Sequence, residues 1–167
     1  LFISEYIEGS SSNKVIEIYN GTGSTVDLSL YELALYTNGA ATPSTTLSLS
    51  GSLLNGDVYV VANSSANGTI LALADTTSGV TNFNGDDAVS LMKNGVVIDA
   101  IGVIGEDPGS SWPVGTGDTV DNTLVRKSSV NAPSVSWNVN EWDVYDSDTT
   151  AYLGSHAFEG SGSTAEI

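Results

Sequence analysis

The chain has 167 residues and a formal net charge of −16, with 20 acidic residues against four Lys and Arg. It has no Cys and one His, which excludes disulfides, Cys-ligated zinc, thiol catalysis and any site with two His ligands from one chain. Four basic residues are too few for the positive patch that binds nucleic acid, and the length predicts one domain.

The first third of the chain alternates apolar and polar residues over short stretches that end at turn residues. This period of two is the pattern of β-strands. It predicts strands at residues 2–7, 15–19, 31–36 and 45–49, with a short extended piece at 26–28.

The middle third contains the clearest local signal. Residues 58–62 are apolar on both faces, which predicts a central strand, and residues 70–74 suit one or two helical turns with Thr69 as N-cap. Strands at 88–93 and 96–101 flank Asn94-Gly95, a pair that accepts the positive φ angles of a type I′ turn. We therefore predict a β-hairpin here.

The last third is less regular. Residues 105–122 are predicted as a loop, residues 123–126 as an edge strand, and residues 131–150 as an irregular segment that carries aromatic side chains. Residues 159–167 are rich in Gly and Ser and predict a flexible tail or linker. The predicted domain thus covers residues 1–158.

These elements amount to about eight or nine short, mostly antiparallel strands with little helix. Such a pattern predicts an all-β fold, an Ig-like β-sandwich, with a sheet closed on itself as the alternative.

Seven separated motifs follow one another along the chain: Phe2–Gly9, Lys14–Gly23, Val26–Ser29, Phe83–Val89, Asp107–Ser110, Asn122–Lys127 and Leu153–His156. In this order they resemble the lamin tail domain family, and in particular its bacterial branch found on secreted nucleases and phosphatases. The resemblance spans about residues 1–158. It implies an Ig-like β-sandwich that acts as an accessory domain, so that any hydrolase would lie elsewhere in a longer protein.

Acidic residues in two loops are candidates for a calcium site. Ca²⁺ takes six to eight oxygen ligands, and Asp86 and Asp87 could supply two of them, joined by Asp107 and Asp121 if the fold brings the loops together. No EF-hand spacing is present. The alternative is that the Asp86-Asp87 pair shapes the turn before a strand, because Asp side chains bond nearby backbone.

Two strand carboxylates and the single histidine are candidates for acid–base chemistry. Glu5 and Glu17 could form an acid–base pair, but their place in half-buried strands favours a structural or solvent-facing role. His156 follows Ser155, yet the chain has no Gly-x-Ser-x-Gly elbow. We therefore expect His156 to pack or to hydrogen-bond rather than to catalyse.

Five aromatic residues of the C-terminal half could form a platform on which sugar rings stack: Trp112, Trp137, Trp142, Tyr145 and Tyr152. The alternative is that the tryptophans fill the sandwich core or cover its ends.

Together these features predict a non-catalytic accessory or binding module of a secreted or cell-surface bacterial protein. Its partner would be a protein or a carbohydrate, and neither nucleic acid nor a membrane. A self-assembling extracellular filament or matrix subunit, which binds copies of itself, is the alternative. A secreted hydrolase with an unrecognised site is the third possibility. No cofactor is predicted apart from Ca²⁺.

Overall fold

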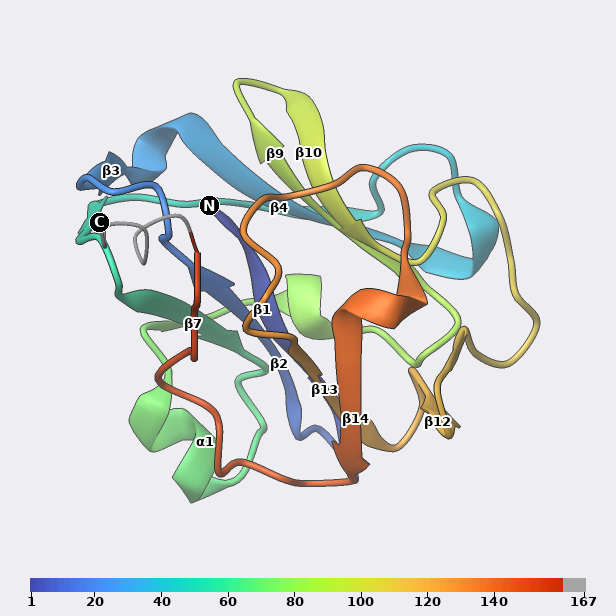
Figure 1. Cartoon of the computed structure of the whole chain (residues 1–167). Coiled ribbons are helices and arrows are strands. Elements are labelled where there is room, and N and C mark those ends of the chain that lie inside the picture. The colour runs from blue at the N-terminus through green and yellow to red at the C-terminus, as the bar shows by residue number, and fades with distance from the viewer. Residues whose placement is uncertain (161–167) are drawn as a thin grey trace.

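The computed structural model describes residues 1–160, and its larger layer is a six-stranded sheet with the order β14-β13-β1-β2-β7-β8 (Figure 1). Its strands are β1 (Phe2–Glu8), β2 (Lys14–Tyr19), β7 (Val58–Ala62), β8 (Thr76–Thr77), β13 (Asn122–Arg126) and β14 (Trp142–Asp146). All neighbours pair antiparallel except β7 and β8, which are parallel.

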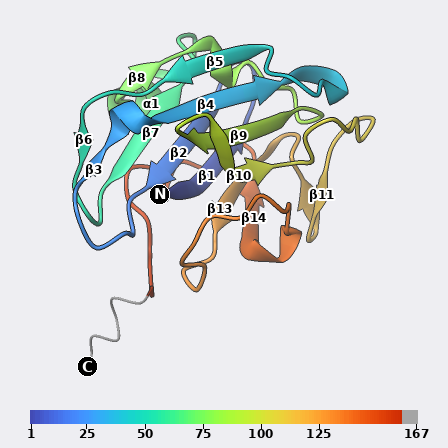
Figure 2. The same cartoon turned by 90° about the horizontal axis from the view of Figure 1, so that it is seen from above.

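The second layer is a four-stranded sheet with the order β10-β9-β4-β5, whose strands lie side by side in Figure 2. They are β4 (Tyr31–Tyr36), β5 (Thr45–Ser48), β9 (Ala88–Lys93) and β10 (Val96–Ile101). Two short ladders join β3 (Val26–Asp27) to β6 (Ser52–Leu53) and β11 (Pro113–Val114) to β12 (Gly117–Asp118). The helices are α1 (Gly68–Leu73) and short 3-10 turns at Leu28–Leu30, Thr37–Gly39, Gly79–Thr81 and Val139–Glu141.

Alternating apolar side chains of both sheets form the main core. Tyr6 of β1 stacks on Phe83 with ring centroids 4.7 Å apart, and Leu33, Leu35 and Leu91 of the second sheet belong to the same buried cluster. Two open sheets that share one core make the predicted all-β, Ig-like sandwich, which is confirmed.

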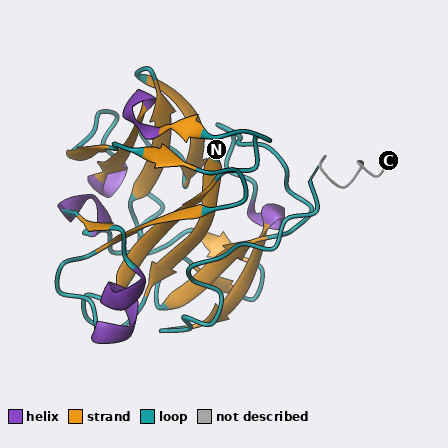
Figure 3. Ribbon diagram, turned by 90° about the vertical axis from the view of Figure 1, so that its left-hand side faces the viewer, coloured by secondary structure: helices purple, strands orange, loops and turns teal. Residues whose placement is uncertain are grey.

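The six-stranded sheet is covered on its other side as well. We call the side that points away from the four-stranded sheet the outer face. There Ile7, Val15 and Val60 pack against Ile70 of α1 and against Leu153. Helix α1 lies at the margin of the sheet in Figure 3. Burial on both sides explains why every residue of β1 is buried.

The predicted hairpin is confirmed. Strands β9 and β10 pair antiparallel, and Asn94 and Gly95 have φ angles of 51° and 77°, as a type I′ turn requires. The helix is also present, but its N-cap is Asn67, whose side chain accepts from the Ile70 N–H, so the prediction of Thr69 was wrong.

The C-terminal half is more regular than its sequence suggests. Residues 123–126 were predicted as an edge strand, but β13 lies inside the sheet between β1 and β14. Strand β14 falls in the segment predicted to be irregular, and the predicted loop 105–122 contains β11 and β12. Of the predicted tail, residues 161–167 lie outside the described part, and Glu159 donates its N–H to the Ser128 carbonyl.

A buried ion pair ties the two sheets together near the N-terminus. The Arg126 guanidinium of β13 donates two hydrogen bonds to Asp99 of β10, at 2.6 and 3.1 Å, and both side chains are at most 2% exposed. Asp99 also accepts from the Ile3 N–H, and Arg126 donates to the Ile3 carbonyl. Each charge thus has several partners, as a buried charge requires.

Candidate functional site

The outer face carries an unusual group of titratable side chains beneath residues 147–160, which we call the C-terminal segment. Hydrogen bonds from the loop after β1 and to β2 hold this segment on the outer face. Asp148 accepts from the Ser10 N–H at 2.9 Å, and the Gly154 N–H donates to Glu17 at 2.8 Å. Leu153 adds an apolar contact with the cluster around α1. The segment therefore covers the sheet rather than leaving it open to water.

Beneath this segment two carboxyl groups face each other. Glu5 of β1 and Glu17 of β2 are direct partners in the antiparallel ladder, and they are 1% and 0% exposed. A β-bulge between Ile3 and Glu5 breaks the alternation, so that Ile3 and Tyr6 both face the core while Glu5 faces outward. A structural or solvent-facing role was expected for these acids, and of the two the burial of both side chains leaves the structural one.

The two carboxyl groups differ in their hydrogen bonds. Glu17 accepts from the Ser4 hydroxyl at 2.6 Å and from the Gly154 N–H, and burial raises its pKa to about 7. Neither oxygen of Glu5 has a hydrogen-bond partner within residues 1–160. Burial, and next the charge of Glu17, raise the pKa of Glu5 to about 9. Glu5 thus carries a proton at neutral pH.

A pair of acids with separated pKa values is also the arrangement that acid–base enzymes use. Here, however, a general acid or base must come within hydrogen-bond reach of a substrate, and Glu5 is covered by protein. In this conformation the pair has a structural role.

His156 packs among aromatic rings on the same face. Its ring lies edge-on to Phe2 with centroids 5.7 Å apart and tilted against Tyr19 at 5.0 Å. Its Nε2 atom is buried without a hydrogen-bond partner among the described residues. Burial, and then the charge of Arg126, lower its pKa to about 4. The prediction that His156 packs is confirmed.

A hollow of about 150 Å³ opens beside these groups. It is lined by Val125, Arg126, Ala151, Tyr152, Ser155, His156 and Ala157. Tyr152 is 42% exposed at its rim, and the ring of Tyr145 lies 4.6 Å away, tilted by 32°. Val125 is the cross-strand neighbour of Glu5. An exposed tyrosine with a half-buried tyrosine against it, a hollow and a buried acid therefore occur together.

The five aromatic residues of the expected platform do not form one surface. Trp112 is buried, and its indole N–H donates to the Asp87 carbonyl at 3.1 Å. Trp142 is 4% exposed and stacks on the Arg126 guanidinium at 4.9 Å, with Trp137 next to it. The tryptophans thus pack in or against the core, as the structural alternative predicted. Of the expected platform only the pair Tyr145 and Tyr152 remains a candidate for stacking.

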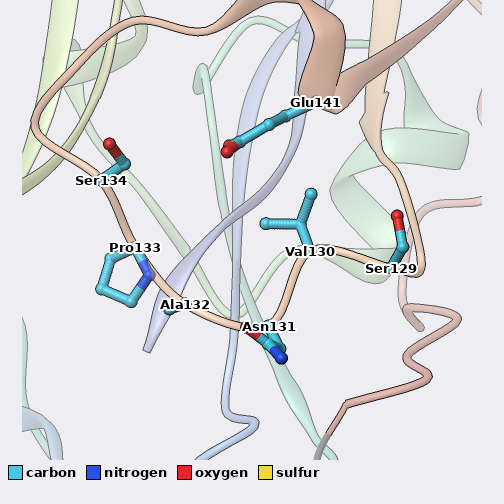
Figure 4. A pocket seen from close by; sticks show the side chains of 7 residues that line it. All are labelled: Ser129, Val130, Asn131, Ala132, Pro133, Ser134 and Glu141. Carbon is cyan, nitrogen blue, oxygen red and sulfur yellow. The ribbon is translucent and has the colours of Figure 1, made fainter.

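A larger hollow of about 320 Å³ lies at residues 129–134 (Figure 4). The loop curves around it, and Glu141 lies across from the loop. The Glu141 carboxylate is already paired with Arg126 at 2.7 Å, and the other lining side chains are small and uncharged. Among the residues that line it, this hollow therefore has no unpaired charged side chain with which to bind or activate a ligand.

The predicted calcium ligands lie in two places. Asp107 is among the charges that raise the pKa of Asp86, after burial and Asp87, so these three acids are near one another. Both oxygens of Asp87 accept backbone amides, those of Asn38 and Asn84, each at 3.0 Å. Asp87 thus shapes its turn, as the alternative proposed.

Asp121 lies instead beside Glu8, whose carboxylate accepts its N–H at 3.1 Å. Within residues 1–160, no three acidic or histidine side chains are placed so that they could hold a metal ion. Calcium binding by Asp86, Asp107 or Asp121 stays a prediction.

A family model described as Lamin Tail Domain matches residues 1–105, which is more than half of the sequence. The chain belongs to the lamin tail domain family. The matched region of this lamin tail domain ends after β10, earlier than the resemblance expected over residues 1–158. Glu5 and Glu17 lie inside the match, whereas Tyr145, Tyr152 and His156 lie beyond it.

A crystal structure of a DUF4876 family protein from Bacteroides thetaiotaomicron VPI-5482 resembles this lamin tail domain with a TM-score of 0.53 and 12% identity. The similarity covers 94% of this chain and 70% of that chain, and at this identity it speaks for the fold alone. No curated protein matches the sequence. Among the described residues, no helix is both long and apolar enough to cross a membrane.

Proposed function

We propose that this lamin tail domain is a non-catalytic accessory module of a secreted or cell-surface bacterial protein, and that it binds a partner on its outer face. Membership of an Ig-like domain family is compatible with a binding or accessory role. The acidic composition supports a setting outside the cell, where salt screens the charge.

The observation that carries the proposal is the tyrosine pair beside the 150 Å³ hollow. Tyr152, backed by the half-buried Tyr145 ring, lines this hollow, and Ser155 provides a polar group in the same lining. Sites that hold small ligands combine such an apolar wall with a few polar groups. A neutral sugar, or a protein segment with hydroxyl side chains, suits this rim better than an anion, because the chain is strongly acidic.

The chemistry of the described acids supports a non-catalytic role. Asp87 and Glu17 are used in hydrogen bonds that hold the fold, Asp99 is paired with Arg126, and Glu5 is covered. We therefore expect no turnover of DNA or of phosphate esters by the purified chain. Turnover that is lost on substitution of one specific Asp or Glu would overturn this part of the proposal.

Binding is tested by titration calorimetry with a panel of soluble neutral polysaccharides. We expect at least one to bind, and Tyr152→Ala to weaken that binding about two- to tenfold, as the loss of a stacked aromatic contact of about 0.5–1.5 kcal/mol would do. Leu54→Ala is the matched control, because Leu54 is an exposed apolar residue far from this hollow in sequence and outside its lining. Equal weakening by both variants, or no binding to any polysaccharide, contradicts a sugar site at this rim.

A further inference from the structure

Strand β5 forms an open edge of the four-stranded sheet. It pairs with β4 on one side, and within residues 1–160 no strand pairs with its other side. Figure 2 shows β5 at the outside of its layer. An open edge presents unpaired backbone groups that can accept another extended strand.

The hydrogen bonds at the end of β5 show which residues point outward. The Leu49 N–H donates to the Tyr31 carbonyl at 3.0 Å, so this pair is of the hydrogen-bonded type. Hydrogen-bonded pairs recur at every second residue of an antiparallel ladder, so Leu47 faces Leu33 in the same way. The N–H and C=O groups of Thr46 and Ser48 therefore point away from β4.

This edge lies in the longest uncharged part of the chain. From Leu33 to Gly56 there are 24 residues without Asp, Glu, Lys, Arg or His, although the chain as a whole carries −16. Natural edge strands are usually blocked by charges, bulges or shortness. The other edges have such protection: β14 carries Asp143 and Asp146, β10 has a bulge, and β8 has two residues. Strand β5, with four residues, has neither a charged side chain nor a bulge.

We propose that β5 pairs antiparallel with β5 of a second copy of this chain. Two chains with the same large negative charge repel each other, and an edge without charged side chains is where they meet with the least repulsion. The nearest acid, Glu32, is on β4 opposite Ser48. Its carboxylate accepts from the Ser48 hydroxyl at 3.4 Å, so this charge reaches over β5, and pairing of the two copies requires salt to screen it.

The register follows from the outward residues. Thr46 of one copy faces Ser48 of the other, and both pairs exchange backbone hydrogen bonds about a two-fold axis at Leu47. Leu47 is partly buried against the main core, and its contact with Leu47 of the second copy covers the part that remains exposed. Since this contact uses the same strand in both copies, the assembly closes as a dimer with an eight-stranded sheet and does not grow into a filament.

The contact is independent of the sugar-binding proposal, because β5 belongs to the other sheet. Sedimentation equilibrium of the full chain between about 10 µM and 1 mM in low and in about 0.15 M NaCl measures it, with screening expected to favour the dimer. Thr46→Pro removes a backbone N–H that points away from β4, so it leaves the hydrogen bonds between β4 and β5 intact. Thr46→Glu places a charge on the open edge. Each is expected to weaken dimerisation about tenfold or more.

Thr77→Glu is the matched control. It makes the same substitution at an exposed threonine of β8, the edge of the other sheet, and is expected to leave the dimer unchanged. Deuterium exchange at the Thr46 and Ser48 amides should slow as the protein concentration rises. A chain that stays monomeric throughout, or a dimer that survives both Thr46 variants, overturns the proposal. An edge that pairs only with added foreign peptides would overturn it as well.

Discussion

Replacing Glu5 by Gln should stabilise the protein at neutral pH. The folded pKa of Glu5 is about 9, against an ordinary value of 4.5. When folding raises the pKa of a carboxyl group, the stabilisation of the folded state by that group is fully present below the unfolded pKa. This stabilisation is lost as the pH rises toward the folded pKa. The free energy of unfolding of the wild type should therefore fall between about pH 4.5 and pH 9.

The size of the effect follows from the same values. At pH 7, which is about 2.5 units above the ordinary pKa, Glu5 of the unfolded chain is ionised, whereas Glu5 of the folded chain keeps its proton, and this difference costs the folded state about 3 kcal/mol. Gln keeps the shape and a polar amide but does not ionise. We expect Glu5→Gln to match the wild type near pH 4 and to be about 3 kcal/mol more stable at pH 7.

Urea denaturation at pH 4, 5.5, 7 and 8.5 measures the difference, provided that the slope of unfolding free energy against urea stays unchanged. Glu106→Gln is the control, because it makes the same charge change at an exposed residue. If the Glu5→Gln and wild-type curves run parallel at all four pH values, burial does not hold Glu5 in its protonated form and the reasoning fails.

Three further predictions concern the turn, the ion pair and calcium. Gly95→Val should cost about 1–3 kcal/mol, because a β-branched residue resists the φ of 77°, and an unchanged melting temperature would contradict the turn geometry. Arg126→Met should cost about 3–5 kcal/mol at pH 7 by leaving Asp99 buried without its cation, and Asp99→Asn added to it should recover part of that loss in urea unfolding. Millimolar Ca²⁺, but not Mg²⁺, should raise the melting temperature in 0.15 M NaCl relative to EDTA, and Asp86→Asn should remove that gain; equal melts with all three would end the calcium prediction.

Local patterns predicted the strands whose neighbours are close in sequence. The hairpin around Asn94-Gly95 is one example, because its turn chemistry and its alternation both lie within about a dozen residues. Strand β13 was placed at an edge because its sequence does not reveal that β1, from the other end of the chain, pairs with it. Chain order alone does not determine sheet order.

The site on the outer face was beyond prediction for the same reason. The alternation in β1 suggests that Glu5 meets water, and two long-range features change this. The bulge before Glu5 sets which side it faces, and the C-terminal segment then covers it. An acid between two apolar residues, as Glu17 is between Ile16 and Ile18, was the available signal, but its burial depends on residues about 140 positions away.

The position of β1 in the sheet has a consequence for synthesis on the ribosome. Glu5 pairs with Val125, 120 residues later, and at about 5–20 residues per second one edge of β1 stays unpaired for about 6–24 s. During that time Glu5 is exposed to water and has its ordinary pKa, so it is ionised at neutral pH. A charged side chain on an open edge disfavours pairing with other nascent chains. The closing of β13 and the C-terminal segment over this strand is therefore coupled to the uptake of a proton by Glu5.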